Sequence, residues 1–365
     1  MRFPSARRAA TVLLLVLVAA TAAAGCGRSS MVGRRVDDFS AYYNKFYNAR
    51  QTFDEATRPL DELDQSVDLG VYLPVFVPPT QVQNEDAFSK TIDKSADLLR
   101  THPGSKWVDD ALLLIGKSYF YQENYVGGER KFREVVGRNG PLEGEARFWL
   151  GRALLAGGDL SAAEQHLAES LQADSLSERW MGHMRLLLGQ VHVRQGMWTP
   201  AADLLERGVR GVRDGQTRAR ALFLRGQVLE AMGRYADATR AYRSAAEERP
   251  RYELAYAAET SALRTAVRAG GRPQERAVFE QLRRLERDDK NRDKRPALAL
   301  LRGQLYQAQG RPGRARRSYK QLLYPGEERA PDAPSVPGDV RGRAHYELGR
   351  LYRDVYSDLD RKSVV

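Results

Sequence analysis

Glycines, large side chains and small side chains recur along this chain in one fixed frame. In the first copy, Gly116 is followed by Tyr119 after three residues, Gly128 after twelve and Phe132 after sixteen. Such self-similarity indicates a repeat protein. The later full copies are Gly151 with Leu154, Ala163 and Leu167; Gly189 with His192, Ala201 and Leu205; Gly226 with Leu229, Ala238 and Tyr242; and Gly303 with Tyr306, Ala315 and Tyr319.

Two further copies are incomplete. A half-copy near the end of the chain has Gly349 and Tyr352, and a degenerate copy has Ala266 and Phe279 but no glycine in frame. The half-copy predicts a first helix over 341–356 without its partner helix. We therefore expect either an exposed apolar strip there or a truncated reading frame, because solenoids normally end in a capping helix with a polar outer face.

The frame predicts two amphipathic helices in each unit, joined by a short turn such as 232–235 or 309–312. The framing glycine of the first helix lets the second helix approach closely, and the small residue of the second helix accepts the large residue of the first. Pro250 ends its helix because it has no N–H and clashes with the preceding turn. One pair cannot bury its own apolar face, so neighbouring pairs must stack into a solenoid.

The segments before the repeats differ in pattern. Residues 86–102 predict one helix with an apolar stripe of Ala87, Phe88, Ile92, Ala96 and Leu99, and residues 36–56 predict a helix rich in aromatic residues. The aromatic residues could face a partner or pack on the first repeat. Between these helices, three prolines predict an extended connector over 69–84, with Val71, Leu73, Val75 and Val77 against the solenoid. A second proline-rich segment, 324–339, predicts a loop.

The stretch Ala221–Pro250 (ALFLRGQVLEAMGRYADATRAYRSAAEERP) resembles the tetratricopeptide repeat at nearly every signature place. The resemblance covers about residues 86–356 and implies an all-α, right-handed superhelical solenoid. In this repeat class the first helix of each pair lines a concave groove. The groove positions lie one residue and four to five residues after the framing glycine: Lys117, Tyr121, Arg152, Gln190, Arg194, Gln227, Glu230, Gln304, Gln307, Arg350 and Arg353.

This set of groove residues is polar with a basic bias. It suits an extended segment or a helix of a partner protein that carries acidic groups. The alternative is that these residues are simply the solvated surface of a structural solenoid.

The start of the chain is typical of an exported protein. Arg2, Arg7 and Arg8 precede an uncharged run over 12–24, which is too short for a comfortable membrane span. Cys26, the only cysteine, follows that run in a sequence that resembles the bacterial lipobox, which implies cleavage before Cys26 and its acylation. Two alternatives remain: an ordinary cleavage site at residues 22–24, or an uncleaved anchor.

The composition and the motifs of the sequence argue against an enzymatic activity of this protein. The chain has 58 Lys and Arg and 47 Asp and Glu, mixed throughout, for a net charge of +11. This mixture fits solvated helix faces better than a nucleic-acid surface, and an exported chain does not routinely meet nucleic acid. No two of the five histidines are three or four residues apart, and phosphate-binding and dinucleotide fingerprints are absent from the sequence. We expect no enzyme activity, no cofactor, no metal and no small-molecule substrate, and a partly buried imidazole at His192.

Two segments resemble narrower families. Residues 103–125 are similar to outer-membrane assembly lipoproteins of the BamD type, and the aromatic residues 42–49 resemble the tetratricopeptide lipoproteins of gliding motility and type IX secretion in Bacteroidota. Both imply a lipid-anchored, periplasm-facing scaffold on the outer membrane that holds other envelope proteins. The alternative is a soluble periplasmic accessory that recruits or regulates cell-wall enzymes.

The expected organisation has six parts. They are a signal peptide (1–25), a tether (26–35), an N-terminal aromatic helix (36–66), a proline-rich connector (67–84), the solenoid (85–356) and a truncated or frayed C-terminus (357–365).

Overall fold

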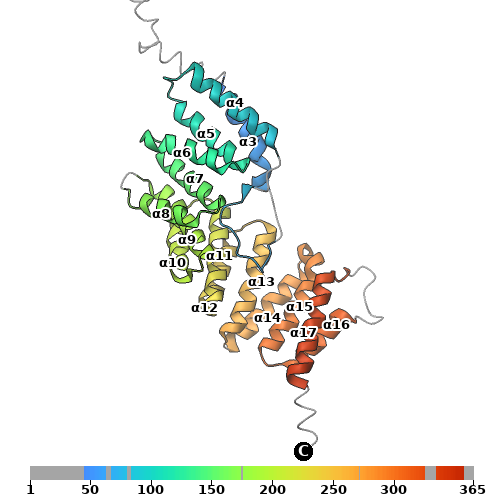
Figure 1. Ribbon diagram of the computed structural model, residues 1–365. Coiled ribbons are helices and arrows are strands. Elements are labelled where there is room, and N and C mark those ends of the chain that lie inside the picture. Colours follow the sequence, from blue (N-terminus) through green and yellow to red (C-terminus); the bar gives the residue numbers. More distant parts are fainter. Residues whose placement is uncertain are drawn as a thin grey trace, which may run out of the picture. The chain divides into compact units, whose positions relative to one another are not determined.

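The computed structural model describes residues 45–62, 67–79, 84–173, 176–270, 272–324 and 334–356. In these residues every regular element is a helix (Figure 1). The chain divides into two compact units: residues up to 63 with 74–212 form unit 1, and residues 64–73 with 213–365 form unit 2. The expected all-α architecture is confirmed.

Unit 1 begins with two helices that precede the repeats, α3 (Tyr47–Glu62) and α4 (Glu85–Thr101). Three helical pairs follow, in which a short turn connects the two members (Figure 1). Side-chain caps begin two of the second helices, because Asn124 accepts from the Gly127 N–H and Asp159 from the Ala162 N–H. The pairs are α5 (Val108–Tyr121) with α6 (Tyr125–Gly137), α7 (Glu143–Ala156) with α8 (Leu160–Ser170), and α9 (Glu178–Arg194) with α10 (Trp198–Gly211).

Unit 2 continues the same construction. Its last pair is followed by a first helix that runs on into a π-helical turn, η4, up to Tyr356, the last described residue. Its elements are α11 (Gly215–Ala231), α12 (Tyr235–Glu247), α13 (Tyr252–Ala269), α14 (Arg272–Arg287), the short 3-10 helix η3 (Asp289–Lys294), α15 (Arg295–Ala308), α16 (Pro312–Leu323), α17 (Gly338–Leu351) and η4 (Tyr352–Tyr356).

The framing glycines place the two helices of each pair in direct contact. A Cβ atom added to Gly303 would lie 2.2 Å from a ring carbon of Tyr319, the residue sixteen positions later. The same relation holds in the other four full copies. The distances from the added Cβ are 2.6 Å to Phe132 at Gly116, 2.7 Å to Leu167 at Gly151, 3.0 Å to Leu205 at Gly189 and 2.6 Å to Tyr242 at Gly226.

The remaining frame positions also behave as predicted. Ala163, Ala201, Ala238 and Ala315 are completely buried in the second helices. Gly233 and Gly310, in the predicted turns, have φ values of 72° and 67°, a conformation that glycine adopts without steric cost. The short hairpin turns are therefore encoded locally.

The degenerate copy shows what replaces a framing glycine. Leu263 stands in the glycine position of α13 and is almost fully buried. Phe279 of α14 instead stacks on Tyr306 of the next pair, with ring centroids 4.6 Å apart.

The helix predicted over 86–102 is present as α4, but its predicted stripe was rotated. Phe88, Thr91, Ser95 and Leu98 form the buried face, whereas Ala96 is exposed. Thr91 can be buried because its hydroxyl donates to the carbonyl of Ala87 in the same helix, at 2.8 Å. Apolar periodicity missed this face because two of its four residues are small and polar.

The aromatic helix packs on the first repeat where it is described. Phe46 stacks on Trp107, with ring centroids 5.2 Å apart, and the ring of Phe53 lies 5.8 Å from that of Tyr121 in α5. Self-packing of these two rings is therefore confirmed, while Phe39, Tyr42 and Tyr43 lie outside the described residues. The helix also runs on past the predicted end at residue 56, to Glu62.

Several expectations concern residues outside the described ranges. They are the leader, Cys26 and its tether, the loop over 325–333 and the C-terminal residues 357–365. Within the described ranges, every helix is either too short or too polar to cross a membrane.

Candidate functional site

The predicted groove residues lie on the first helices of the pairs: α5, α7 and α9 in unit 1, and α11, α15 and α17 with η4 in unit 2. We call this surface of each unit its groove face. Part of it is covered by the chain's own connector, the described residues 67–79. The sequence predicted an extended connector that rests on the solenoid. In the described residues the connector forms neither an α-helix nor a strand, and its main chain is hydrogen-bonded to the repeats.

In unit 2, Gln227 holds the first part of the connector. Its side-chain carbonyl accepts from the Leu73 N–H at 2.8 Å, and its amide group donates to the Val71 carbonyl at 2.8 Å. One glutamine therefore pairs with the N–H of one connector residue and with the C=O of the residue two positions earlier. In an extended chain these two groups lie on the same edge. Gln227 itself is only 9% exposed.

In unit 1, the equivalent residues of two other repeats hold the second part of the connector. The side-chain carbonyl of Gln190 accepts from the Val75 N–H at 2.9 Å, and Arg152 donates to the Val77 carbonyl at 2.8 Å. Both residues lie one position after a framing glycine, as Gln227 does. The side chain of Val75 is 2% exposed.

Proline explains why the connector suits this role. Pro74 and Pro78 have no N–H, so the chain there does not form helical hydrogen bonds. The odd-numbered residues 71, 73, 75 and 77 present their main-chain groups to the groove face. The sequence predicted that the side chains of these four residues lie against the solenoid. Of the four, only Val75 is buried, and the prediction is wrong for Val71, whose side chain is 61% exposed.

Arg152, a member of the predicted groove set, lies among aromatic rings. Its guanidinium lies 4.3 Å from the ring centroid of Trp149 and 4.7 Å from that of Phe120, and Phe76 of the connector is 5.8 Å away. Phe76 also meets Phe148 edge-on at 4.9 Å. Burial lowers the pKa of Arg152. This cation and its aromatic neighbours hold the chain's own segment.

The other predicted groove residues of unit 1 also have internal partners. Lys117 forms an ion pair with Glu145, and Tyr121 stacks on Phe88 with ring centroids 5.3 Å apart. Arg194 is exposed, and it donates to the Leu155 carbonyl at 3.0 Å. A pocket of about 240 Å³ beside Lys117 includes Asp110, and burial raises the pKa of that carboxyl group.

Glu230 and Gln307 occupy equivalent positions in unit 2, four residues after their framing glycines. Each accepts a hydrogen bond at 3.0 Å from the tyrosine hydroxyl sixteen residues after the same glycine, Tyr242 or Tyr319. This repeated hydrogen bond shows that α11 and α15 present their groove faces in the same register.

The C-terminal part of the groove face contains an open pocket of about 390 Å³. Three of the predicted residues line it together, and we call it the C-terminal pocket. Arg353 is not among its lining residues, because it lies on η4 and pairs with its neighbour Asp354 at 2.7 Å. The pocket is lined by Arg264, Arg268, Gln304, Leu305, Gln307, Ala308, Glu347 and Arg350.

The repeat frame did not identify Arg264 and Arg268 as groove residues, because their copy of the repeat has no framing glycine. They lie one and five residues after Leu263, which stands in the glycine position, so the frame itself could have identified them. Both arginines bind Glu230, at 3.1 and 3.0 Å. Glu347 pairs with Arg350 at 3.0 Å. Nothing in the repeat frame indicated that Glu347 would line the pocket.

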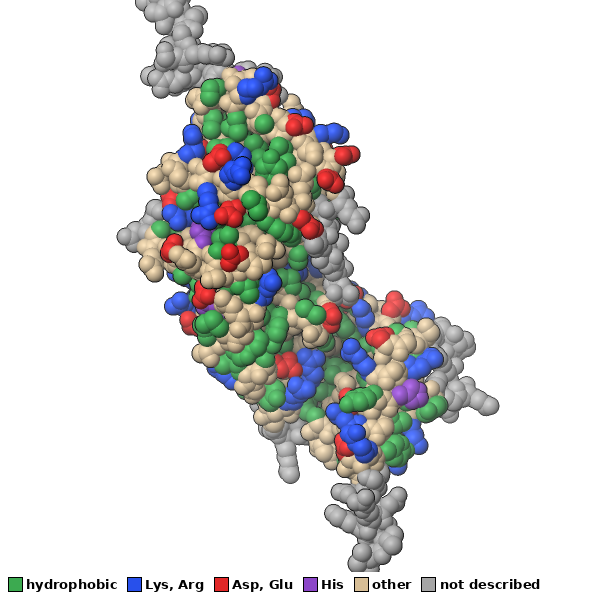
Figure 2. Space-filling model, viewed as in Figure 1, with side chains coloured by type: hydrophobic (Ala, Val, Ile, Leu, Met, Phe, Trp, Pro, Cys, Tyr) green, Lys and Arg blue, Asp and Glu red, His purple; other side chains and the backbone are tan. Residues whose placement is uncertain are grey.

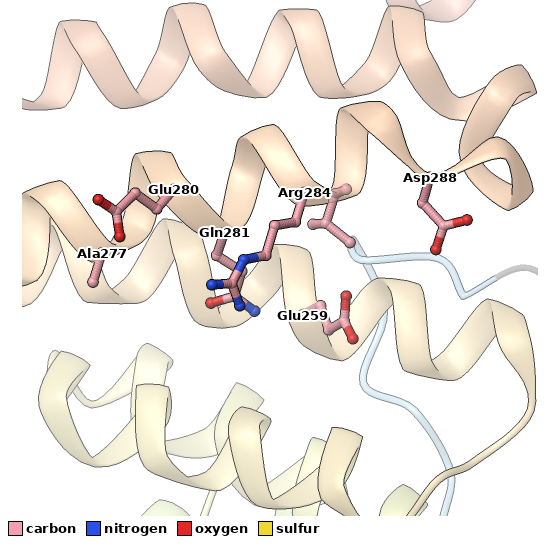
Figure 3. Close-up of a pocket in the computed structure, with 7 residues that line it drawn as sticks. Glu259, Ala277, Glu280, Gln281, Arg284 and Asp288 are labelled. Carbon is pink, nitrogen blue, oxygen red and sulfur yellow. The ribbon is translucent and has the colours of Figure 1, made fainter.

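A larger pocket of about 490 Å³ lies between α13 and α14 (Figure 3). Figure 3 shows Gln281 and Arg284 side by side on α14, with Glu259 on α13 below them. Burial raises the pKa of Glu259, and the negative charge of Asp288 adds to that effect. The basic residues 283–294 end α14 and form η3, and Lys294 of η3 pairs with Glu253 at 3.0 Å.

The histidines and acidic residues form no metal site in the described part of the chain, where no group of three or more His, Cys, Asp and Glu could hold an ion. His192 is buried as predicted, and its Nε2 lies 3.2 Å from Glu164. On the face seen in Figure 2, blue and red side chains are interspersed. This mixture agrees with the solvated helix faces expected from composition.

Comparison with known proteins finds a family match over part of the chain. Residues 113–178 and 186–253 match the tetratricopeptide repeat family. These segments run from α5 to the start of α13 and include four of the framing glycines. No curated protein matches the sequence. Proteins built from this repeat are typically non-catalytic scaffolds that bind other proteins.

The comparison with solved structures finds matches with TM-scores below 0.5. The MamA protein is 20% identical with a TM-score of 0.40, over 51% of this chain and 94% of that chain. The C-terminal part of a repeat-containing protein from Cytophaga hutchinsonii is 14% identical with a TM-score of 0.48, over 67% and 93%. A tetratricopeptide repeat protein from Parabacteroides merdae is 11% identical with a TM-score of 0.40, over 81% and 99%.

Proposed function

We propose that this chain, an all-α solenoid of tetratricopeptide repeats, is a lipid-anchored scaffold at the periplasmic face of the outer membrane. There it holds other envelope proteins during envelope assembly or secretion. The observation that carries the proposal is Cys26, which directly follows a basic and then apolar leader and precedes a protein-binding repeat array. The lipobox resemblance of residues 23–26 supports acylation of that cysteine.

The groove face supports protein binding rather than catalysis. Gln227 and Gln190 already bind the main chain of an extended segment, which is the chemistry that a scaffold needs for a partner. The aromatic and amide side chains around the connector supply contact area and hydrogen bonds. The resemblance to BamD-type and type IX secretion lipoproteins supports envelope proteins as the partners.

Acylation would make membrane attachment firm. Each buried CH₂ contributes about 0.8 kcal/mol, and stable anchoring takes more than one acyl chain. A scaffold gains from such confinement because its partners in the same membrane reach a high effective concentration.

The anchor is tested by Cys26→Ser in the producing bacterium. We expect the variant to leave the outer-membrane fraction and appear in another fraction, while circular dichroism shows unchanged helicity. The measurement is cell fractionation with immunoblotting, and Ser30→Ala is the control for a mutation in the same tether. If the variant stays in the outer membrane in wild-type amounts, the lipid anchor is wrong.

The scaffold role is tested by chemical crosslinking in cells followed by purification of the tagged protein. We expect a stable set of envelope proteins that is absent when the tag alone is exported. Recovery of the chain without any envelope protein, in growing cells at native expression level, would contradict the scaffold role.

A soluble periplasmic accessory to cell-wall enzymes is the second candidate. It is favoured by Ala22-Ala23-Ala24, which fits an ordinary cleavage site, and by Ala23 at the place where the lipobox prefers leucine. Mass spectrometry of the mature N-terminus separates the two candidates. A lipidated Cys26 supports the anchored scaffold, and an unmodified N-terminus with co-purifying peptidoglycan enzymes supports the soluble accessory.

A further inference from the structure

We propose that the C-terminal pocket binds an extended, acidic segment of another protein, and that Gln304 holds the main chain of that segment. This inference rests on the proposed scaffold role and names the surface and the chemistry of the partner. The pocket lies entirely within unit 2, on α13, α15 and α17.

The connector provides an internal template for this binding mode. Gln227, one residue after Gly226, makes one hydrogen bond to residue 71 and one to residue 73, both at 2.8 Å. Gln190, one residue after Gly189, binds residue 75. In both cases the glutamine contacts the main chain only, so the binding mode does not depend on the side chains of the bound segment.

Gln304 is the equivalent residue of the C-terminal pocket. It follows framing Gly303, and the matching bonds of Tyr319 to Gln307 and Tyr242 to Glu230 show that α15 and α11 share their register. The Gln304 amide group donates to Glu347 at a long 3.3 Å, and its carbonyl oxygen has no partner among the described residues. The described connector residues do not line this pocket.

The charges around the pocket indicate which kind of peptide segment it can bind. Among the described residues, Arg264 and Arg268 pair with Glu230 and Arg350 pairs with Glu347, so three arginines meet two carboxylates and one net positive charge is left. Each guanidinium has five N–H donors, so an arginine bound to a glutamate can still donate to a second carboxylate. An extended segment with aspartate or glutamate side chains therefore fits better than a neutral or basic one.

The test uses fluorescence polarisation with the full chain and a defined probe. The probe is a fluorescein-labelled peptide with the sequence of residues 71–75 (VYLPV) between two pairs of aspartates. A second peptide has serines in place of the aspartates. We expect the acidic peptide to bind about tenfold more tightly than the serine peptide at low salt, with the difference shrinking as salt screens the charges.

Single substitutions then assign the binding to the pocket. Gln304→Ala should weaken binding of both peptides about tenfold, because two main-chain hydrogen bonds are lost. Gln321→Ala, at an exposed position of α16 outside the groove face, is the matched control and should bind as the wild type does. Arg268→Ala should weaken binding of the acidic peptide alone, and Arg317→Ala is its control.

Three outcomes would overturn the inference. The first is unchanged binding in folded Gln304→Ala. The second is loss of binding in Gln227→Ala but not in Gln304→Ala, which would mean that the peptide displaces the connector. The third is a Gln304-dependent dimer in sedimentation velocity, which would mean that a second copy fills the pocket. If Gln304→Ala does not fold, Gln304→Asn shortens the same amide and takes its place.

Failure of this inference is distinguishable from failure of the proposed function. If crosslinking captures envelope partners equally with wild type and Gln304→Ala, the scaffold role stands and the C-terminal pocket is excluded as the binding surface. If the peptide binds through Gln304 but the chain captures no envelope protein, the pocket stands and the proposed envelope role fails.

Discussion

At the scale of single residues, one missing Cβ in each repeat decides how closely its two helices pack. Glycine in a helix interior costs about 1 kcal/mol relative to alanine, so a recurring helical glycine needs a packing reason. Here the reason is the side chain sixteen residues later, which lies on the bare backbone in all five full copies. Gly349 has no such neighbour among the described residues, since nothing lies within 4 Å of its added Cβ.

This difference predicts opposite effects of one substitution at two matched positions. Gly303→Ala should destabilise unit 2 by about 1–2 kcal/mol, because Tyr319 is fully buried and its hydroxyl is bonded to Gln307. Gly349→Ala should be neutral or stabilise by up to about 1 kcal/mol through helix propensity. Urea unfolding followed by circular dichroism measures both. Equal effects at the two positions would contradict the packing role of the framing glycines.

At the scale of elements, the connector is part of the folded structure rather than a passive link. Its main chain is held by three side chains from three different repeats, each one residue after a framing glycine. These two amides and one guanidinium replace the strand neighbour that an extended segment otherwise needs for its N–H and C=O groups. The connector therefore uses groove residues that a partner would otherwise contact.

Hydrogen exchange can test each attachment separately. Gln227→Ala should accelerate exchange of the Leu73 amide about five- to tenfold and leave the Val75 amide nearly unchanged, because one hydrogen bond contributes about 1 kcal/mol. Gln190→Ala should have the converse effect, so each variant is the control for the other. The measurement is exchange followed by mass spectrometry or NMR. Unchanged exchange at both amides would mean that the connector does not depend on these glutamines.

At the scale of the whole molecule, the groove faces divide into two kinds of surface. The sections that contain Arg152, Gln190 and Gln227 are covered by the chain's own residues, and the C-terminal pocket is open. A partner can reach the covered sections only by displacing the connector, whereas the open section needs no rearrangement. The same repeat frame therefore yields binding positions of different availability.

Replacing residues 74–77 with a glycine-serine sequence should uncover the groove face of unit 1. A labelled peptide of residues 74–79 (PVFVPP) should then bind the variant at least tenfold more tightly than it binds the wild-type chain, because no internal segment competes. Adding Gln190→Ala to the variant should reduce that binding. Equal affinity for the variant and the wild-type chain would show that the connector does not shield this surface.

The fold could be predicted from the sequence because its determinants are local. Gly226 and Tyr242 belong to one helical hairpin, and the turn glycine Gly233 lies between them in the sequence. Neighbouring hairpins then contact only one another. The face of α4 was mispredicted for the opposite reason. Burial of Thr91 and Ser95 depends on the neighbouring structure and not on their polarity.

The candidate site could be predicted only in part. Gln304, Gln307 and Arg350, which the frame selected, line one pocket, but the frame gave no sign that Lys117 is paired with Glu145 or that Arg353 lies outside the pocket. Those relations join residues whose pairing depends on rotamers and local helix ends. Arg264 and Arg268 were missed because the search required a glycine.

The sequence by itself determined the helical hairpins, their register and the extended character of the connector, since each depends on residues close together along the chain. Only the tertiary structure decided which groove positions are covered. Residues 71 and 73 lie more than 150 positions from Gln227, and no periodic pattern encodes which side chain an extended main chain will meet. Main-chain groups are the same in every residue, so their partners are chosen by the fold.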